Sequence, residues 1–225
     1  MHSKKYQKVK EKINEDKSYS LEEAISFIKE NPLTKFDETI ELHVRLGINP
    51  QKTEQQVRGT ILLPSGTVKQ KRIAAFVSPD NEKEAKEAGA DLVGGTELIE
   101  KIKMTSKCDF DLAIAEPVLM KNLAQIAKIL GPRGLMPNPK TGTVTTEIKK
   151  TIKELRKGKI SFKNDAGANL HQPIGKISWT HDKIKDNVEA FLGAVNKTKP
   201  GGVKKAFIQS IVLSSTMGPS IKIQL

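Results

Sequence analysis

Residues 20–46 contain two successive patterns of apolar residues. Ser20 and Glu23 have the spacing of a helix capping box, and apolar residues then recur at helical spacing until Pro32, which predicts a short amphipathic helix. From Thr39 to Leu46 every second residue is apolar instead, a period that predicts a strand with one buried and one polar face. We expect residues 57–63 to form the partner of this strand.

The middle of the chain alternates between strand-like and helical stretches. Apolar runs typical of strands cover residues 73–77, 90–93 and 110–115, and helical patterns cover residues 82–88, a stretch from residue 96, residues 117–130 and residues 147–157. Strands that alternate with helices indicate a parallel sheet, so we expect a Rossmann-like α/β layer. The sequence has neither a glycine-rich dinucleotide turn nor a phosphate-binding loop, so this layer does not imply a nucleotide.

The last part of the chain returns to the alternating style. Its predicted elements are a strand at 159–163, a turn at 164–167, a strand at 174–180, a helix that contains residues 184–195 and a strand at 207–214. Both ends of the chain have strands with alternating apolar and polar residues, whereas the middle alternates strands with helices. We therefore expect an α/β and α+β protein of two domains. Residues 1–66 and 158–225 would form a discontinuous α+β domain, and residues 67–157 an inserted Rossmann-like α/β domain.

Two chain crossings would join these domains. One lies at Pro64, Ser65 and Gly66 and the other at Lys157 and Gly158, and such a pair of connections would act as a double hinge. A single continuous domain is the alternative, because 225 residues suit either organisation.

Charge narrows the choice of partner. The chain has 38 lysines and arginines against 26 acidic residues, a net charge of +12, which favours a polyanion as partner. Aromatic residues make up only 4% of the chain, so a surface that stacks successive bases is poorly supported, and recognition of nucleic-acid shape and backbone fits better. The lysine-rich segment 4–17 is either a frayed helix or a basic arm.

The reactive side chains form no known catalytic or metal-binding pattern. The single cysteine, Cys108, excludes an internal disulfide, and the four histidines lie far apart in the sequence without metal-ligand spacing. Asp109 and Asp111 are more typical of a solvated strand entry than of a catalytic pair. We therefore expect no enzyme, cofactor or metal. Since no apolar run reaches about 20 residues, we also expect no membrane span and a cytosolic location.

Small polar residues and lysines near several predicted strand ends indicate contact with RNA. Ser214, Ser215, Thr216 and Gly218 offer short hydroxyls and bare backbone, which can approach a phosphate or a ribose 2′-hydroxyl closely. A second group comprises Lys35, Phe36, Thr39, Glu41, Lys159, Lys163, Asn164, Asp165 and Gly167. If these segments adjoin, they would read RNA through its backbone and sugars. Unrelated polar strand ends, with Phe36 buried, are the alternative.

Several segments resemble one protein family over nearly the whole chain. Residues 131–144, which begin Gly-Pro-Arg-Gly-Leu-Met-Pro-Asn-Pro-Lys, are similar to the signature segment of the L-one family of large-subunit ribosomal proteins. Residues 55–59 and 63–66 resemble its first hinge region, residues 162–165 and 171–175 the part of its discontinuous domain after the second crossing, and residues 215–218 its C-terminal motif. The sequence Leu-Met-Pro-Asn-Pro indicates the bacterial type.

The resemblance implies a function and partners. Members of this family belong to the mobile lateral stalk of the ribosome, bind 23S rRNA chiefly through the discontinuous domain, and help deacylated tRNA to leave the exit site. Bacterial members also repress translation of their own operon by binding its mRNA. We therefore expect a non-enzymatic ribosomal constituent that is monomeric when free. An α/β enzyme or nucleotide-binding protein that uses the central layer, and an mRNA regulator without a ribosomal role, are the alternatives.

The resemblance also implies which residues form the rRNA surface. They are Lys35, Phe36, Thr39, Glu41, Lys163, Asn164, Asp165, His171, Ser210, Thr216, Met217 and Gly218. The chain departs from the family at Asn49, where many members have aspartate, at Ala166, where a basic residue is usual, and at Ala168, where glycine is usual. The last two departures put the route of the loop after Asp165 in question.

Overall fold

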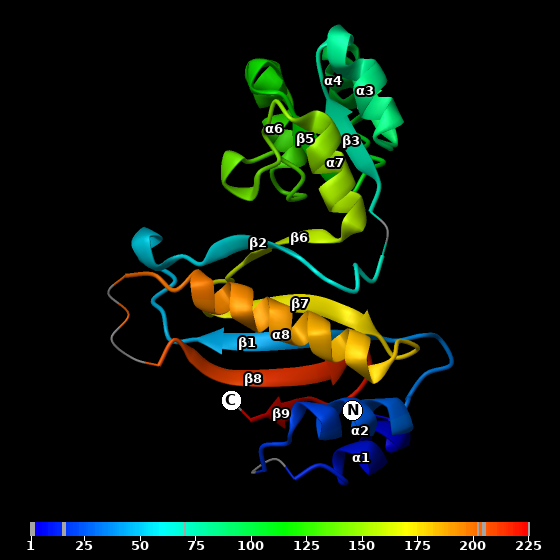
Figure 1. Ribbon diagram of the computed structural model, residues 1–225, viewed down its shortest axis with the longest axis vertical. Coiled ribbons are helices and arrows are strands. Elements are labelled where there is room, and N and C mark those ends of the chain that lie inside the picture. Colours follow the sequence, from blue (N-terminus) through cyan, green and yellow to red (C-terminus); the bar gives the residue numbers. More distant parts are fainter. Residues whose placement is uncertain (1–2, 15–16, 70, 202, 204–205, 225) are drawn as a thin grey trace. The chain divides into compact units, whose positions relative to one another are not determined.

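The computed structural model describes residues 3–14, 17–69, 71–201, 203 and 206–224. The chain divides into two compact units. Met1–Val68 and Ile160–Leu225 form the discontinuous unit, and Lys69–Lys159 forms the inserted unit. Both units combine helices with strands (Figure 1). The mixed α and β fold class expected from the sequence is therefore confirmed.

A four-stranded antiparallel sheet forms the centre of the discontinuous unit. Its strands are β1 (Thr39–Leu46), β7 (Asn169–Lys176), β8 (Ile208–Ser215) and β9 (Ile221–Ile223), in the order β7-β1-β8-β9. Strand β1 pairs with β7 along one edge and with β8 along the other. One sheet is thus built from both ends of the sequence, because β1 comes from the first part and its neighbours from the last.

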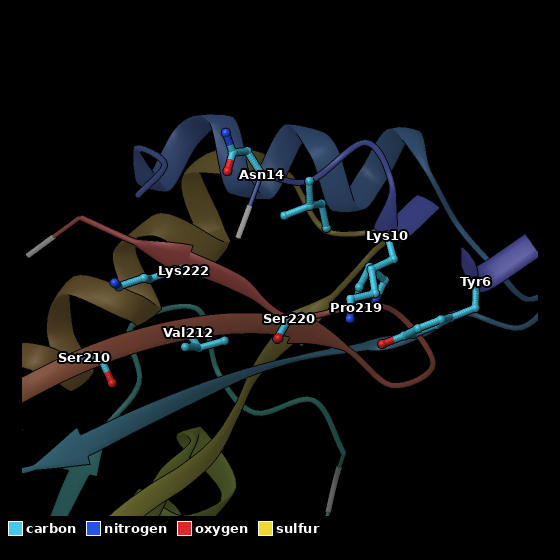
Figure 2. Close-up of a pocket in the computed structure, with 9 residues that line it drawn as sticks. Tyr6, Lys10, Asn14, Ser210, Val212, Pro219, Ser220 and Lys222 are labelled. Carbon is cyan, nitrogen blue, oxygen red and sulfur yellow. The ribbon is translucent and has the colours of Figure 1, made fainter. Parts of the chain in front are cut away.

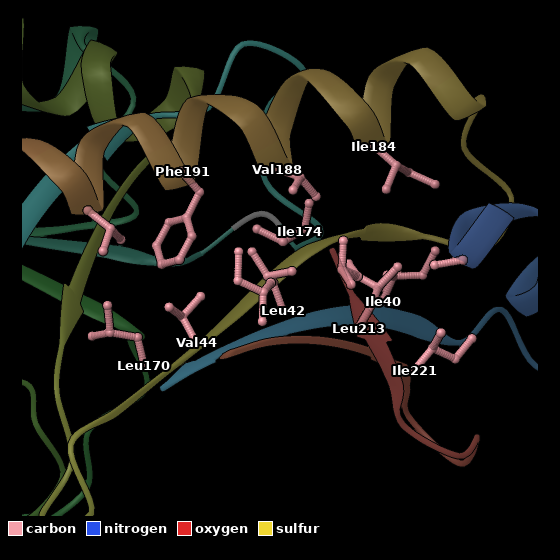
Figure 3. Packing of buried hydrophobic residues seen from close by; sticks show 14 of the residues in the cluster. Ile40, Leu42, Val44, Leu170, Ile174, Ile184, Val188, Phe191, Leu213 and Ile221 are labelled. Carbon is pink, nitrogen blue, oxygen red and sulfur yellow. The ribbon is translucent and has the colours of Figure 1, made fainter. Parts of the chain in front are cut away.

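One face of this sheet packs against two helices. Alternate residues of β1 from Ile40 to Leu46 are buried, as the period of two predicts. Figure 3 shows Ile184, Val188 and Phe191 of α8 (His181–Lys197) directed at this face of the sheet. Helix α2 (Leu21–Glu30) adds its apolar side to the same core, and its first turn carries the predicted capping box of Ser20 and Glu23.

The inserted unit contains a three-stranded parallel sheet. Its strands β3 (Ile73–Phe76), β4 (Leu92–Gly94) and β5 (Leu112–Ala115) have the order β4-β3-β5. Helices α3 (Glu82–Glu87) and α7 (Ile148–Lys157) pack on one face, and α4 (Thr96–Thr105) with residues 117–130 packs on the other. All four residues of the central strand β3 are buried for this reason.

The single helix expected over residues 117–130 is instead a series of short turns. They are η3 (Pro117–Leu119), α5 (Met120–Leu123), η4 (Ala124–Ile126) and α6 (Ala127–Leu130). Leu123, Ile126 and Leu130 still face the core, whereas the backbone of Ile126 leaves the helical region at φ −105° and ψ 10°. Helical spacing identifies the buried side of such a segment but not the tight turns that interrupt it.

Two strand predictions are wrong. Strand β2 (Arg58–Leu62) pairs with β6 (Lys159–Lys163) in a separate two-stranded sheet and not with β1, because β7 and β8 already occupy both edges of β1. The strand expected at 174–180 is β7, which begins five residues earlier, at Asn169, and ends at Lys176. Strand β9 has no counterpart among the predictions, since three residues carry too little pattern.

The remaining elements are short. They are α1 (Lys4–Lys10), which makes the described start of the lysine-rich segment helical, and the 3-10 turns η1 (Thr53–Gln55), η2 (Pro79–Asn81) and η5 (Pro139–Thr141). Residues 15 and 16 of the lysine-rich segment lie outside the described residues. Within the described part of the chain, no helix has the length and apolar character needed to cross a membrane.

A buried amide anchors the first of the two predicted crossings. Asn187 of α8 is fully buried, and its Oδ1 accepts a hydrogen bond from the amide of Ser65 at 3.1 Å. Its Nδ2 donates to the carbonyl oxygens of Ile174 at 2.8 Å and Gly66 at 3.4 Å. Residues 64–66 are thereby tied to α8 and β7. The second crossing lies at the C-terminal end of α7, where the C-cap residue Gly158 has φ 113°. A hinge role for either crossing stays a prediction.

We expect Asn187→Ala to lower the free energy of unfolding by about 1–3 kcal/mol, because the backbone groups of Ser65 and Ile174 would lose their buried partner. Chemical denaturation monitored by circular dichroism would measure the change. Asn196→Ala, an exposed position on the same helix, is the matched control and should stay within about 0.5 kcal/mol of the wild type. Equal effects of the two substitutions would contradict the anchoring role of Asn187.

Candidate nucleic-acid interface

The face of the four-stranded sheet that does not meet α2 and α8 carries polar side chains. On β1 these are Thr39, Glu41, His43 and Arg45, which alternate with the buried residues. The pairing places Pro173 and Ser214 beside Glu41, His171 and Val212 beside His43, and Asn169 and Ser210 beside Arg45. We call these ten residues the open face. It brings together five of the residues expected at an RNA surface: Thr39, Glu41, His171, Ser210 and Ser214.

Two histidines meet at the centre of the open face. The Nδ1 atoms of His43 and His171 are 2.8 Å apart, and the rings meet edge to face with centroids 5.0 Å apart. The Nε2 of His43 lies 3.0 Å from the hydroxyl of Ser214, and the Nε2 of His171 lies 3.4 Å from Oδ2 of Asp165. Burial and the neighbouring His171 lower the pKa of His43, while Glu41 acts in the opposite direction.

His43 was not among the predicted site residues. The available signal was its place in the alternation, since it falls between Glu41 and Arg45 on the polar side of the strand. Its contact with His171 could not be predicted, because 127 residues lie between the two histidines and only the register of β1 with β7 joins them. Ser214, in contrast, was identified as a polar strand end.

The loop between β6 and β7 is folded around Asp165. Its Oδ1 accepts hydrogen bonds from the backbone amides of Gly167 at 2.8 Å and Asn169 at 2.7 Å, and the bond from the Asn169 amide is the main cause of a lowered Asp165 pKa. Ala168, at the position where the family usually has glycine, is buried with φ 63°, a left-handed conformation that favours glycine. In this chain the left-handed turn is therefore formed with alanine at the position.

Among the described residues, no hydrogen bond or ion pair joins the side chain of Asn164 or Lys163 to the ten residues of the open face. Asn164 is buried, and its Oδ1 accepts a hydrogen bond from the backbone amide of Val57 at 2.8 Å, which ties the end of β6 to the start of β2. Lys163 is exposed at the end of β6, two residues before Asp165. The loop thus supplies Asp165 to the histidine pair, while Asn164 holds the loop in place.

One end of the sheet is closed by Thr216. Its hydroxyl accepts a hydrogen bond from the amide of Thr39 at 3.0 Å and donates to the carbonyl of the same residue at 3.2 Å. Met217 follows with 55% of its surface exposed. A Cβ on Gly218 would lie 2.4 Å from the Ser215 hydroxyl, so a larger residue in the close turn after β8 would displace that hydroxyl. Thr216 and Gly218 therefore shape this end, and Met217 projects from it.

A buried carboxylate joins two exposed apolar residues at this end. Glu38 is inaccessible to solvent. Its Oε1 accepts hydrogen bonds from the amides of Leu33 and Thr34 and from the Thr34 hydroxyl, and its Oε2 accepts one from the Met217 amide at 3.3 Å. This carboxylate fixes the loop that carries Lys35 and Phe36 next to the turn that carries Met217. Phe36 is 57% exposed, which removes the alternative in which Phe36 is buried.

Glu38 is ionised in spite of its burial. Burial alone would raise its pKa, but hydrogen bonds from Ser215, Thr34 and the backbone amides of Met217 and Leu33 together hold the pKa below its usual value. Sequence reasoning missed Glu38, because a single acid between Asp37 and Thr39 has no pattern that indicates burial. Its burial as an anion depends on five hydrogen-bond donors, which come together only in the folded chain.

A pocket of about 460 Å³ lies at the β8–β9 edge of the sheet, next to the open face. Its lining includes Tyr6 and Lys10 of the N-terminal segment and Ser210, Val212 and Lys222 of the sheet. In Figure 2, Lys10 lies near Pro219, which follows β8. Lys222 pairs with Val212 of the open face. Helix α1 therefore places Lys10 in the lining of a pocket that shares Ser210 and Val212 with the open face. In the described part of the chain, histidine, cysteine and acidic side chains nowhere gather in a group of three that would suit a metal ion.

The inserted unit places a carboxylate where a nucleotide phosphate would bind. In parallel sheets, ligands bind at the carboxyl ends of the strands. At this edge Glu116, which is almost fully buried after β5, accepts hydrogen bonds from the amide and hydroxyl of Ser78 at 3.1 and 2.7 Å and from Nδ2 of Asn81 at 2.6 Å. These bonds lower its pKa against the effect of burial. An ionised carboxylate there disfavours phosphate.

Most of the chain matches the model of one protein family. Residues 28–219 match the model of the ribosomal protein L1p/L10e family, which is most of the chain. The chain belongs to this family. The expectation of a bacterial-type member is confirmed, and the family consists of ribosomal proteins rather than enzymes, as expected.

Similar proteins cover the chain almost completely. It is 46% identical over 222 residues to the large ribosomal subunit protein uL1 of Thermosipho africanus, an alignment that covers 99% of this chain and 96% of that protein. It is 45% identical over 224 residues to the uL1 of Fervidobacterium nodosum, covering 100% of this chain and 95% of that protein. The uL1 of Solibacter usitatus is 46% identical over 220 residues, covering 98% and 92%.

We expect Glu38→Gln to lower the free energy of unfolding by about 1–3 kcal/mol at pH 7, because a carboxamide cannot accept all the hydrogen bonds that the carboxylate accepts. The folded-state pKa of Glu38 is lowered, so its contribution is present above the ordinary glutamate value of about 4.3 and is lost as the pH falls through the folded-state value. The difference between variant and wild type should therefore shrink below about pH 4.3.

Urea unfolding between pH 3 and pH 7 would measure this difference. Glu30→Gln, at an exposed position that ends α2, serves as the matched control and should follow the wild type at every pH. A constant difference between Glu38→Gln and wild type over the whole range would rule out an ionised Glu38 as the source of the stability.

Proposed function

We propose that this protein is a structural constituent of the large ribosomal subunit that binds 23S rRNA directly through the open face. The observation that carries the proposal is the sheet itself, which gathers Thr39, Glu41, His171 and Ser210 on one polar surface. Phe36 and Met217 stand exposed at its Thr39 end. The names of the similar proteins and the family membership support the ribosomal part of the proposal.

The chemistry of the open face suits a folded RNA. Hydroxyl groups of Thr39, Ser210 and Ser214 can bond to phosphate and ribose oxygens, and Arg45 can bind phosphate. Phe36 and Met217 can pack against a sugar or an unstacked base, which gives affinity without a row of aromatic platforms. The net charge of +12 adds long-range attraction for a polyanion.

The finer parts of the proposal rest on the family resemblance. We propose that the protein lies in the mobile lateral stalk and assists the release of deacylated tRNA from the exit site. We also propose that it represses its own operon by binding the operon mRNA. One open face can serve both rRNA and mRNA, because both would offer the same folded RNA surface. The proposed location is the ribosome in the cytoplasm, and the proposed free form is a monomer.

Fractionation of ribosomes tests the main statement. We expect the protein in the large-subunit fraction at one copy per subunit, and retained at moderate salt. Presence in the soluble pool alone would contradict a structural role and would leave an mRNA regulator without a ribosomal role as the better reading. Binding to isolated rRNA and mRNA fragments, compared under one buffer condition, would then separate the two RNA partners.

We expect Met217→Ala to weaken binding to a stalk rRNA fragment by about 1–3 kcal/mol, because the exposed side chain would lose its desolvated contact. Filter binding or fluorescence anisotropy would measure the affinity. Met104→Ala is the matched control, since Met104 is 85% exposed on α4 of the inserted unit. If both variants bind as the wild type does, Met217 lies outside the interface.

We expect affinity for the same fragment to fall as salt rises. Each phosphate that a lysine or arginine neutralises contributes a slope of about 0.7 to 0.9 in a plot of log affinity against log salt concentration. If Arg45 contacts the RNA backbone, Arg45→Gln should reduce that slope by the contribution of about one phosphate. A slope near zero for the wild type would contradict the electrostatic part of the proposal.

A further inference from the structure

Four hydrogen-bonded side chains form a row across the open face, from Ser214 on β8 through His43 on β1 and His171 on β7 to Asp165. We propose that this row, called the histidine row, is a one-proton site that couples RNA binding to the uptake of a proton. This inference rests on the RNA-binding function proposed above. It adds that RNA binding depends on pH and that His43 is the residue responsible for this dependence.

The geometry allows one arrangement of protons in the neutral row. A neutral imidazole has one N–H group and one acceptor nitrogen, so the Nδ1–Nδ1 contact of 2.8 Å needs a donor on one ring and an acceptor on the other. If His43 donates from Nδ1, its Nε2 accepts from the Ser214 hydroxyl at 3.0 Å. His171 then accepts at Nδ1 and directs its Nε2–H at Asp165, 3.4 Å away. Every group has a partner.

The same row accepts one further proton without a change of position. A proton added at Nε2 of His43 makes that ring an imidazolium, and the Ser214 hydroxyl rotates from donor to acceptor. A second proton would have to bind Nδ1 of His171, where an N–H group of His43 already points. That would oppose two donors and two positive charges at 2.8 Å. The row therefore changes charge by one unit.

Burial and the neighbouring ring of His171 favour the neutral form of His43 in the free protein. Glu41 and Arg45 flank His43 on β1, Asp165 ends the row, and β8 contributes the uncharged Ser210, Val212 and Ser214. Beyond β8 lie Lys222 of β9 and, lining the adjoining pocket, Tyr6 and Lys10. Burial and His171 lower the pKa of His43, against the effect of Glu41, so the neutral form of the His43 ring prevails at neutral pH in the free protein.

Bound RNA would reverse this balance. Phosphates over the open face favour the charged form of a histidine and raise its pKa. When a group has a higher pKa in the complex than in the free protein, affinity rises as the pH falls between the two values, by at most about tenfold per pH unit for one proton. The proposal therefore predicts tighter RNA binding at mildly acidic pH.

The test measures the affinity of the full chain for a stalk rRNA fragment between pH 5.5 and pH 8.0 at constant ionic strength. We expect wild-type affinity to rise about threefold to tenfold towards the acid end, within the limit for one proton. His43→Gln and His171→Gln should remove most of this rise. The control, His181→Gln, lies on α8 beside Ser26 and should keep it. Acid-induced changes in the RNA affect all four proteins equally and cancel in the comparison.

Ring signals of His43 and His171 in NMR spectra give a second measurement. We expect the uptake of one proton shared by the two rings, with a midpoint that RNA moves upward. Unchanged midpoints, a wild-type affinity independent of pH, or a rise that survives in both His43→Gln and His171→Gln would overturn the inference while RNA binding stands. Absence of binding at every pH would instead overturn the proposed function. Thermal unfolding at each pH confirms that every variant is folded.

Discussion

The antiparallel pairing of β1 with β7 and β8 is the interaction on which the rest of the structure depends. It joins segments from the two ends of the sequence, and ordering a chain over such distances costs entropy that only extensive burial repays. Alternate residues of β1 supply that burial against α2 and α8, and the residues between them form the open face. A slip of one position would exchange the two faces, so the core and the candidate RNA surface are fixed by one register.

Three buried polar side chains then determine where the loops lie. Glu38 accepts hydrogen bonds from backbone amides of the segment before β1 and of the turn after β8, Asn187 holds the first crossing, and Asn164 joins the end of β6 to the start of β2. A buried carboxylate or amide is costly when any of its partners is lost. These loops are therefore held in one arrangement, which is the condition for placing Phe36 and Met217 at one end of the sheet.

The two units offer different chemistry. The open face of the discontinuous unit combines hydroxyls, an arginine and a histidine pair, groups that can bind phosphate and sugar. The inserted unit has the strand order of a nucleotide-binding layer, yet Glu116 and its three hydrogen bonds occupy the edge where a phosphate would bind. The strand order by itself therefore says nothing about activity here, whereas the residues at the sheet edge do.

The sequence by itself determined the fold class, the faces of β1 and the capped helix α2, because these depend on period and on contacts within a few residues. Its resemblance to a family also indicated His171 and Ser210, whose role in RNA binding stays a prediction. Only the tertiary structure decided that β1 pairs with β7 and β8 and not with β2, that His43 meets His171, and that Glu38 is buried beneath Met217. These contacts join residues far apart in the chain, and no local pattern encodes which distant strand will occupy an edge.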